Sequence, residues 1–102
     1  MKSLNTTLSV RGAIYGDYEE GSLFIANTMA EMERVRRAQG YLPLTEENRV
    51  HINYILLKLT RIMITPNHVD SWHDLAGYAK LTEEVYEKRN INGGSDVAQN
   101  EV

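Results

Sequence analysis

The chain has 102 residues, 42% hydrophobic and 25% charged, which is typical of one soluble globular domain. Its net charge of −3 at pH 7 argues against binding to double-stranded nucleic acid through a broad basic surface. The sequence contains no cysteine, which excludes disulfides, thiolate metal sites and cysteine nucleophiles. The longest apolar run, residues 52–64, is interrupted by Lys58 and Arg61 and is too short to span a membrane. We therefore expect a cytoplasmic protein without membrane contact.

Residues 1–21 predict an irregular N-terminal arm and turn segment. Residues 1–10 show no usable hydrophobic period, so a short strand, a loose arm and a first helical turn all remain open. Gly12, Gly16 and Gly21 then follow at short intervals, a pattern typical of turns.

Residues 22–89 predict a helical domain with three main helices. Ser22 is a favourable cap for the first helix, which ends before Gly40. Thr45 caps the second, and Pro66 ends it because the residue before a proline avoids helical geometry.

The second helix is apolar over much of its circumference. One stripe follows helical spacing, and further apolar residues broaden it. The stripe consists of Val50, Tyr54, Leu57 and Ile64, and the residues that broaden it are Ile52, Ile55, Leu56, Leu59, Ile62 and Met63. Such a helix is central to a fold or shared with a partner subunit.

The third helix is predicted from Asp70, its N-cap, to about Arg89, and residues 90–102 are expected to form a disordered tail. Gly77 costs about 1 kcal/mol relative to alanine inside a helix, so we expect a close helix crossing there. The expected buried face consists of Trp72, Leu75, Ala76, Ala79, Val85 and Tyr86.

These elements predict an all-α fold, a small helical bundle of about three main helices. Three helices bury the wide apolar face of the middle one poorly. We therefore expect a homo-oligomer that completes the bundle.

Two cations interrupt the apolar middle helix. Lys58 and Arg61 are three residues apart and therefore neighbours on the helix surface. Buried charges need partners, so one interpretation pairs them with Asp17, Asp70 or Asp74. The other is a phosphate clamp, in which Arg61 gives bidentate contacts and Lys58 a point charge.

Candidate metal ligands gather at the start of the third helix. Asp70 and Asp74 are four residues apart and could share Mg²⁺, although capping by Asp70 is the stronger interpretation. His68 lies beside them and is a candidate ligand-binding residue. Trp72 is a further candidate because it could stack on a base.

The segment around Arg11 and Tyr15 completes the candidate ligand site. Both side chains lie in a polar and aromatic cluster that is unusually dense for a simple turn. Glycine next to Tyr15 lets the backbone approach a ligand or makes the turn itself.

Three segments resemble a family of small uncharacterised proteins from bacteriophages and prophages. They are RGAIYGD at residues 11–17, LLKLTR at 56–61 and NHVDSWHDLAGYAKL at 67–81. The most specific pattern is His-x-Asp-x-Trp-x-Asp-x-Ala-Gly-Tyr. The resemblance implies a phage-type origin and a host-cell cytoplasmic location, and it carries no established activity.

A weaker similarity is to the all-α nucleotide pyrophosphatases of the MazG type. Those proteins place basic residues on one helix and an acidic pair near the start of a later one. The similarity implies magnesium bound by carboxylates, but the first predicted helix offers only Glu31 and Glu33, which point to different sides of a helix because they are two residues apart. We keep the analogy of fold and discount the activity.

Two functions follow from these patterns. The favoured one is a phage-type accessory protein that binds a host factor or a phosphate-bearing small molecule, such as a nucleotide, without catalysis. The alternative is a metal-dependent nucleotide pyrophosphohydrolase that uses Lys58, Arg61, Asp70 and Asp74.

Overall fold

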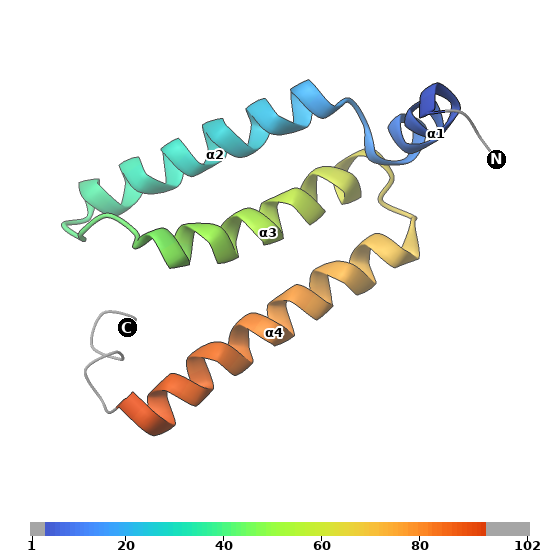
Figure 1. Ribbon diagram of the computed structural model, residues 1–102. Helices are drawn as coiled ribbons and strands as arrows, with labels where there is room; N and C mark the ends of the chain where they lie inside the picture. Colours follow the sequence, from blue (N-terminus) through green and yellow to red (C-terminus); the bar gives the residue numbers. More distant parts are fainter. Residues whose placement is uncertain (1–3, 94–102) are drawn as a thin grey trace.

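The computed structural model describes residues 4–93, and its regular elements are four α-helices. These are α1 (Leu4–Tyr15), α2 (Tyr18–Ala38), α3 (Glu46–Ile64) and α4 (Val69–Gly93). The last three lie side by side with α3 in the middle, and α1, α2 and α4 each pack against α3 (Figure 1). The predicted all-α fold with three main helices is confirmed.

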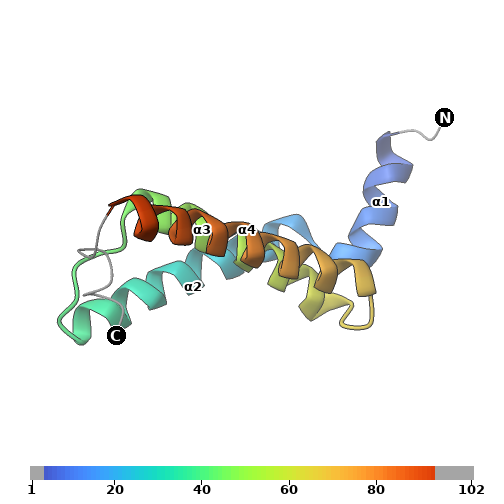
Figure 2. The same ribbon diagram turned by 90° about the horizontal axis from the view of Figure 1, so that it is seen from below.

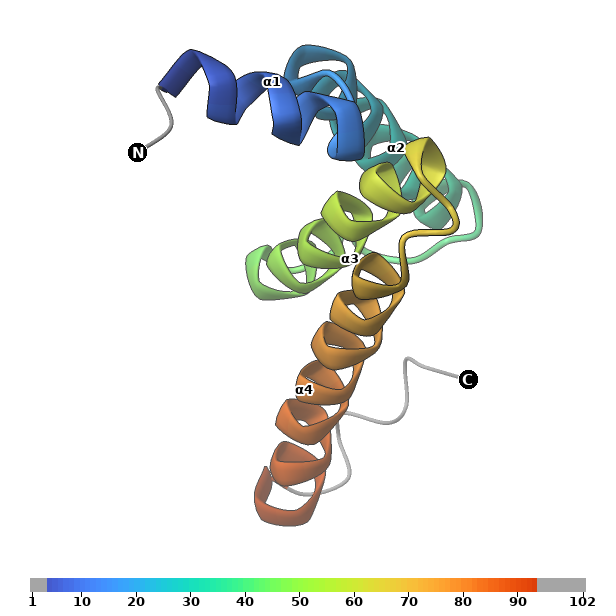
Figure 3. The same cartoon turned by 90° about the vertical axis from the view of Figure 1, so that its right-hand side faces the viewer.

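The short helix α1 stands apart from the layer formed by α2, α3 and α4. It lies across the C-terminal end of α3 (Figure 3) and projects away from the layer (Figure 2). The molecule therefore has a flat part and a projecting arm that meet at one corner. No helix in residues 4–93 combines the length and apolar character needed to cross a membrane.

The N-terminal segment is helical, so the prediction of an irregular arm over residues 1–21 is wrong for the part that is described. α2 begins at Tyr18 and not after Ser22, because Asp17 provides the cap. The Oδ2 atom of Asp17 accepts the backbone N–H of Glu20 at 2.9 Å. Asp17 thus satisfies one of the free donors of the first turn.

Gly16 makes the turn between α1 and α2. Its φ of +88° lies in the left-handed region, which side chains other than glycine rarely adopt. A Cβ atom at this position would lie 2.6 Å from Cγ1 of Ile64. This close approach fixes the corner of the molecule onto the end of α3.

The apolar core lies mainly between α2 and α3. Met29, Leu56 and Ile62 are its buried apolar side chains among the described residues. An ion pair between Arg49 and Glu33, 3.0 Å apart, links the same two helices at their other end. Thr45 caps α3 as predicted, and its side chain accepts the N–H of Asn48.

The contact between α3 and α4 is a polar and aromatic seam. It contains two ion pairs, a hydrogen bond, and stacked and edge-on rings, and it runs along most of both helices. The pairs, from one end to the other, are Glu47–Arg89, Asn48–Tyr86, His51–Tyr86, Tyr54–Tyr78 and Lys58–Asp74.

α4 is longer at both ends than predicted. It begins at Val69, so Asp70 lies inside the first turn and is not the cap. Negative charge still stabilises that position through the helix dipole. The helix continues to Gly93, so residues 90–93 are helical and not part of a disordered tail. Residues 94–102 lie outside the described residues.

Two predictions about packing in α4 are wrong. Trp72 is half exposed, because its indole Nε1 donates to the carbonyl of Pro66 at 2.7 Å and holds the ring at the corner. Gly77 marks no helix crossing within the described chain, since a Cβ atom there would meet nothing within 4 Å.

The predicted stripe on α3 is exposed. Val50, Tyr54 and Ile64 each retain 47% exposure and Leu57 retains 39%. α2 and α4 occupy the two sides of α3, so the face between them is left open except near the C-terminal end of α3, where α1 packs.

Replacing Gly16 by alanine should lower the free energy of unfolding by about 2 kcal/mol or more. The new methyl group would meet Ile64 and would have to adopt a positive φ. Urea unfolding followed by circular dichroism measures the change. Gly12→Ala is the matched control: it lies within α1 with open space around it and should stabilise the helix by up to about 1 kcal/mol. Equal effects of both substitutions would contradict the role assigned to Gly16.

The ion pair at the far end of the seam predicts a pH dependence. A hydrogen bond from Arg89 lowers the pKa of Glu47 below its usual 4.5. The ionised carboxylate therefore stabilises the folded state above about pH 5, and this contribution is lost as the pH falls through the lowered pKa. In Arg89→Gln the loss of stability between about pH 5 and pH 3 should be shallower, as measured by urea unfolding at each pH.

Arg37→Gln, an exposed substitution on α2, is the control for this experiment and should keep the wild-type slope. Some acid dependence should remain in both variants, because Arg34 lowers the pKa of Glu31 in the same way. An unchanged slope in Arg89→Gln would show that the Glu47 pair does not contribute.

Candidate functional site

A pocket of about 430 Å³ lies at the corner where α1, α2 and α3 meet. This volume falls within the range of small-molecule sites. Its walls combine apolar side chains, two arginines, an aspartate, a tyrosine, two aliphatic hydroxyls and three glycines. The lining residues are Leu8, Arg11, Gly12, Gly16, Asp17, Tyr18, Gly21, Ser22, Ile25, Leu57, Thr60 and Arg61.

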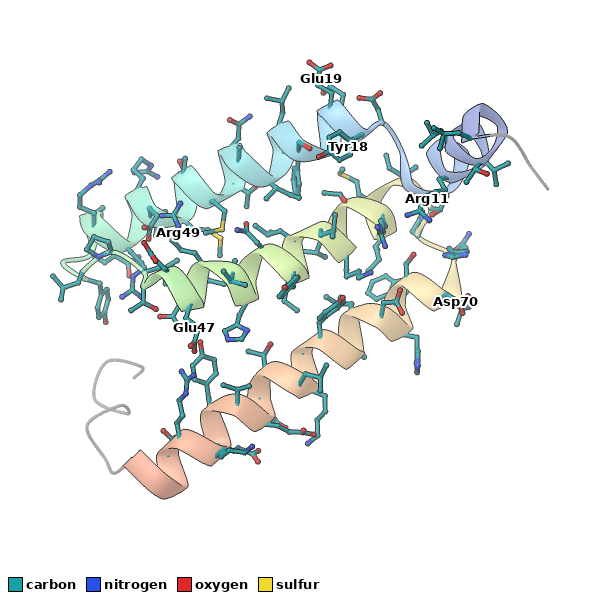
Figure 4. All side chains as sticks on the ribbon, in the orientation of Figure 1. Arg11, Tyr18, Glu19, Glu47, Arg49 and Asp70 are labelled. Atoms are coloured by element: carbon teal, nitrogen blue, oxygen red, sulfur yellow. The ribbon has the colours of Figure 1, made fainter. Side chains whose placement is uncertain are left out.

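The two guanidinium groups of the pocket come from distant parts of the sequence. Arg11 is carried by α1 and Arg61 by the last turn of α3, and the turn at Gly16 brings the two helices together. In Figure 4 Arg11 extends from α1 toward the C-terminal end of α3. Arginine presents several N–H donors in a planar fork, which suits bidentate contact with phosphate or carboxylate oxygens.

The two aliphatic hydroxyl groups of the pocket are held by their own helices. Ser22 Oγ donates to the carbonyl of Tyr18 at 2.9 Å, and Thr60 Oγ1 donates to that of Leu57 at 2.6 Å. Each hydroxyl is thereby fixed in orientation. Asp17 brings a negative charge to the rim, but its carboxylate is occupied by the N-terminal turn of α2.

Lys58 turns away from this pocket and toward α4. Its side chain is only 9% exposed, and its Nζ lies 3.5 Å from Oδ2 of Asp74. The same ammonium lies 5.3 Å from the centroid of the Tyr78 ring, which stacks on Tyr54 with centroids 5.2 Å apart. The carboxylate and the ring face together offset part of the cost of burying the charge.

The first turn of α4 is tied down by side-chain hydrogen bonds. His68 Nδ1 lies 3.0 Å from the hydroxyl of Ser71, which is only 2% exposed. One turn away, Trp72 is bonded to the carbonyl of Pro66. These contacts fix the α3–α4 corner.

The two candidate metal ligands, Asp70 and Asp74, do not share a site. Asp70 lies on the outside of the first turn of α4 (Figure 4), and Asp74 pairs with Lys58. Within the described part of the chain, no three His, Asp or Glu side chains converge as metal ligands.

The structure thus divides the predicted ligand site into separate groups. Arg11 and Arg61 share the pocket, whereas Lys58 and Asp74 form an ion pair in the seam. The remaining candidates do not line the pocket: His68 and Trp72 bond at the corner of α4, and Asp70 is exposed. The side chain of Tyr15 lies outside the described part of the structure.

Several pocket residues were missed from the sequence. Tyr18, which is 89% exposed, falls in the predicted turn segment, and Ser22 is predicted only as a helix cap; Thr60 is not among the predicted site residues. A signal was present for Thr60, because it precedes Arg61 directly and is a small polar residue in an apolar segment. Tyr18 and Ser22 can be recognised as neighbours on one helix only when α2 is known to begin at Tyr18, which the sequence does not predict.

The chain belongs to the family described as "Domain of unknown function (DUF6378)", whose model matches residues 2–86. This confirms that the protein is a member of an uncharacterised family. No curated protein matches the sequence, and no solved structure matches the chain. The phage-type origin and the similarity to MazG-type pyrophosphatases remain predictions.

Reversing the charge of Lys58 should strongly destabilise the fold. Lys58→Glu places a buried carboxylate beside Asp74, and the expected loss is about 3 kcal/mol of unfolding free energy. Adding Asp74→Lys should recover more than half of it, because the pair is restored with inverted polarity. Denaturant unfolding of the four proteins of this cycle gives the coupling. Lys80→Glu, on the exposed side of α4, should change stability far less. If Lys58→Glu is as mild as this control, the Lys58–Asp74 pair does not hold α4.

Proposed function

We propose that this protein binds a phosphate-bearing small molecule in the pocket between α1, α2 and α3, and that it acts by binding and not by catalysis. One observation carries the proposal. Arg11 and Arg61, fifty positions apart in the sequence, line one pocket of ligand size. The apolar walls from Leu8, Ile25 and Leu57 lower the local dielectric, which strengthens a guanidinium–phosphate contact.

The pocket chemistry favours a ligand that is partly apolar. An anionic group would bind the two guanidiniums, and a sugar hydroxyl could bond to Ser22 or Thr60. A planar or aliphatic part would lie against Leu8, Ile25 and Leu57. A nucleotide combines these three features. The accessory role of a phage-encoded protein, which the sequence motifs suggest, is part of the same proposal.

The binding function is favoured over hydrolysis by the position of Asp74. A metal-dependent pyrophosphohydrolase would need Asp70 and Asp74 to hold Mg²⁺. The Lys58 ammonium already lies 3.5 Å from the Asp74 carboxylate, where it would repel a second cation. We therefore expect that Mg²⁺ is bound by the ligand's phosphate groups and not by Asp70 and Asp74.

Thermal melting of the pure protein against nucleotides, cyclic nucleotides, inorganic phosphate and pyrophosphate tests the proposal. Each ligand is used with and without Mg²⁺ or Mn²⁺. A true ligand should raise Tm progressively, and at a hundred times its Kd it should stabilise the fold by about 2.7 kcal/mol. A flat response to every compound in the panel would contradict the proposal.

Arg11→Gln and Arg61→Gln should each weaken binding by about tenfold or more in calorimetric titration, because each removes a charge-assisted contact. Arg37→Gln is the matched control: it makes the same change of charge on an exposed turn outside the pocket and should leave Kd unchanged. If all three variants bind equally, the ligand lies elsewhere on the molecule.

A further inference from the structure

We propose that two copies of this chain pair through the open face of α3, antiparallel and related by a two-fold axis. The face, here called the α3 stripe, consists of residues that recur at spacings of three and four. They are Glu46, Val50, Tyr54, Leu57 and Arg61. Such spacing places all of them along one side of a helix.

The α3 stripe is apolar and exposed at its centre, and its Arg61 end adjoins α1 at the pocket. Val50 and Tyr54 retain 47% exposure and Leu57 retains 39%. Leu81, 59% exposed, extends the apolar surface onto α4, because it follows Tyr78 by one turn and Tyr78 stacks on Tyr54. Exposed apolar surface that spans neighbouring elements marks an interaction site.

The charges at the ends of the α3 stripe favour a second copy as the occupant. Glu46 stands at the N-terminal end and forms no ion pair with any other described residue, and Arg61 stands at the C-terminal end. In an antiparallel pair the negative end of each helix meets the positive end of the other. The stripe is thus complementary to itself, as an isologous two-fold interface requires.

One register satisfies the charged and the apolar positions together. If Glu46 lies opposite the partner's Arg61, Val50 lies opposite the partner's Leu57. The two-fold axis then passes between Asn53 and Tyr54. No residue of the stripe is left facing a like charge. Arg61 can serve both this contact and the pocket, since its guanidinium carries five N–H donors.

The projecting helix α1 fits the same arrangement. In this register the C-terminal end of α3 lies beside the loop between α2 and α3 of the other copy. α1 rises from that end of α3, on the side away from the layer (Figures 2 and 3). Leu4 and Leu8 of α1 are 73% and 56% exposed, and Leu42 in the loop is 80% exposed. Each arm can therefore cover the apolar loop of the other copy.

Gly77 offers independent support from α4. A glycine inside a helix costs about 1 kcal/mol relative to alanine, and nothing in the described chain lies within 4 Å of its missing Cβ. It precedes Leu81 by one turn, on the same side of α4. In the dimer, the second copy would approach the backbone at Gly77 closely. This contact would explain the glycine, which has no packing role within the described part of the single chain.

Light scattering coupled to size exclusion, and sedimentation at several concentrations, measure the mass. Wild type should form a dimer of twice the 11.6 kDa chain. Val50→Asp should raise the dimer Kd at least tenfold while circular dichroism stays unchanged, because the position is half exposed in the single chain. Leu23→Asp, equally exposed on α2, is the matched control and should remain dimeric.

A charge exchange tests the register. Glu46→Arg and Arg61→Glu should each raise the dimer Kd about tenfold, and the double variant should return it close to wild type. The readout is mass, so it does not depend on any ligand. A monomer at all concentrations would overturn the proposal, as would a dimer that Val50→Asp leaves intact. Failure of the double variant to recover would overturn the antiparallel register.

Discussion

The helices of the described chain are held together by their common packing against α3. A central helix flanked on two sides buries residues on both, and the remaining circumference is left to solvent or to another molecule. The result is a layer and not a closed bundle, and within residues 4–93 its buried apolar side chains are Met29, Leu56 and Ile62. So small a core makes the polar contacts around α3 important for stability.

The seam between α3 and α4 shows how those contacts work. A lysine in an apolar helix is costly by itself, yet Lys58 has Asp74 and the face of Tyr78 within reach. These partners specify the register of α4, because a shift along the helix would leave a buried ammonium without a counterion. Aliphatic contacts alone would tolerate such a shift more easily.

The sequence predicts a helix correctly where residues next to its ends determine those ends. Thr45 and Pro66 bound α3 through a capping hydroxyl and a steric restriction, and both signals are readable in the sequence. The helix α1 has no such signal, since its residues lack an apolar period. The sequence also could not tell which glycine makes the turn. Gly16 does so because Ile64, nearly fifty residues later, lies against it, and no local pattern contains that contact.

The sequence identifies some residues of the candidate site, but it does not show which of them lie together in the structure. Lys58 and Arg61 are neighbours on α3, so the sequence predicts one shared role for them, either a phosphate clamp or ion pairing with nearby aspartates such as Asp74. In the structure different neighbours flank them: α4 meets Lys58, and α1 meets Arg61. One helical turn therefore separates a cation that holds the fold from a cation that lines a pocket. Stability and binding can for this reason be changed independently, which lets each role be assigned to its own residue.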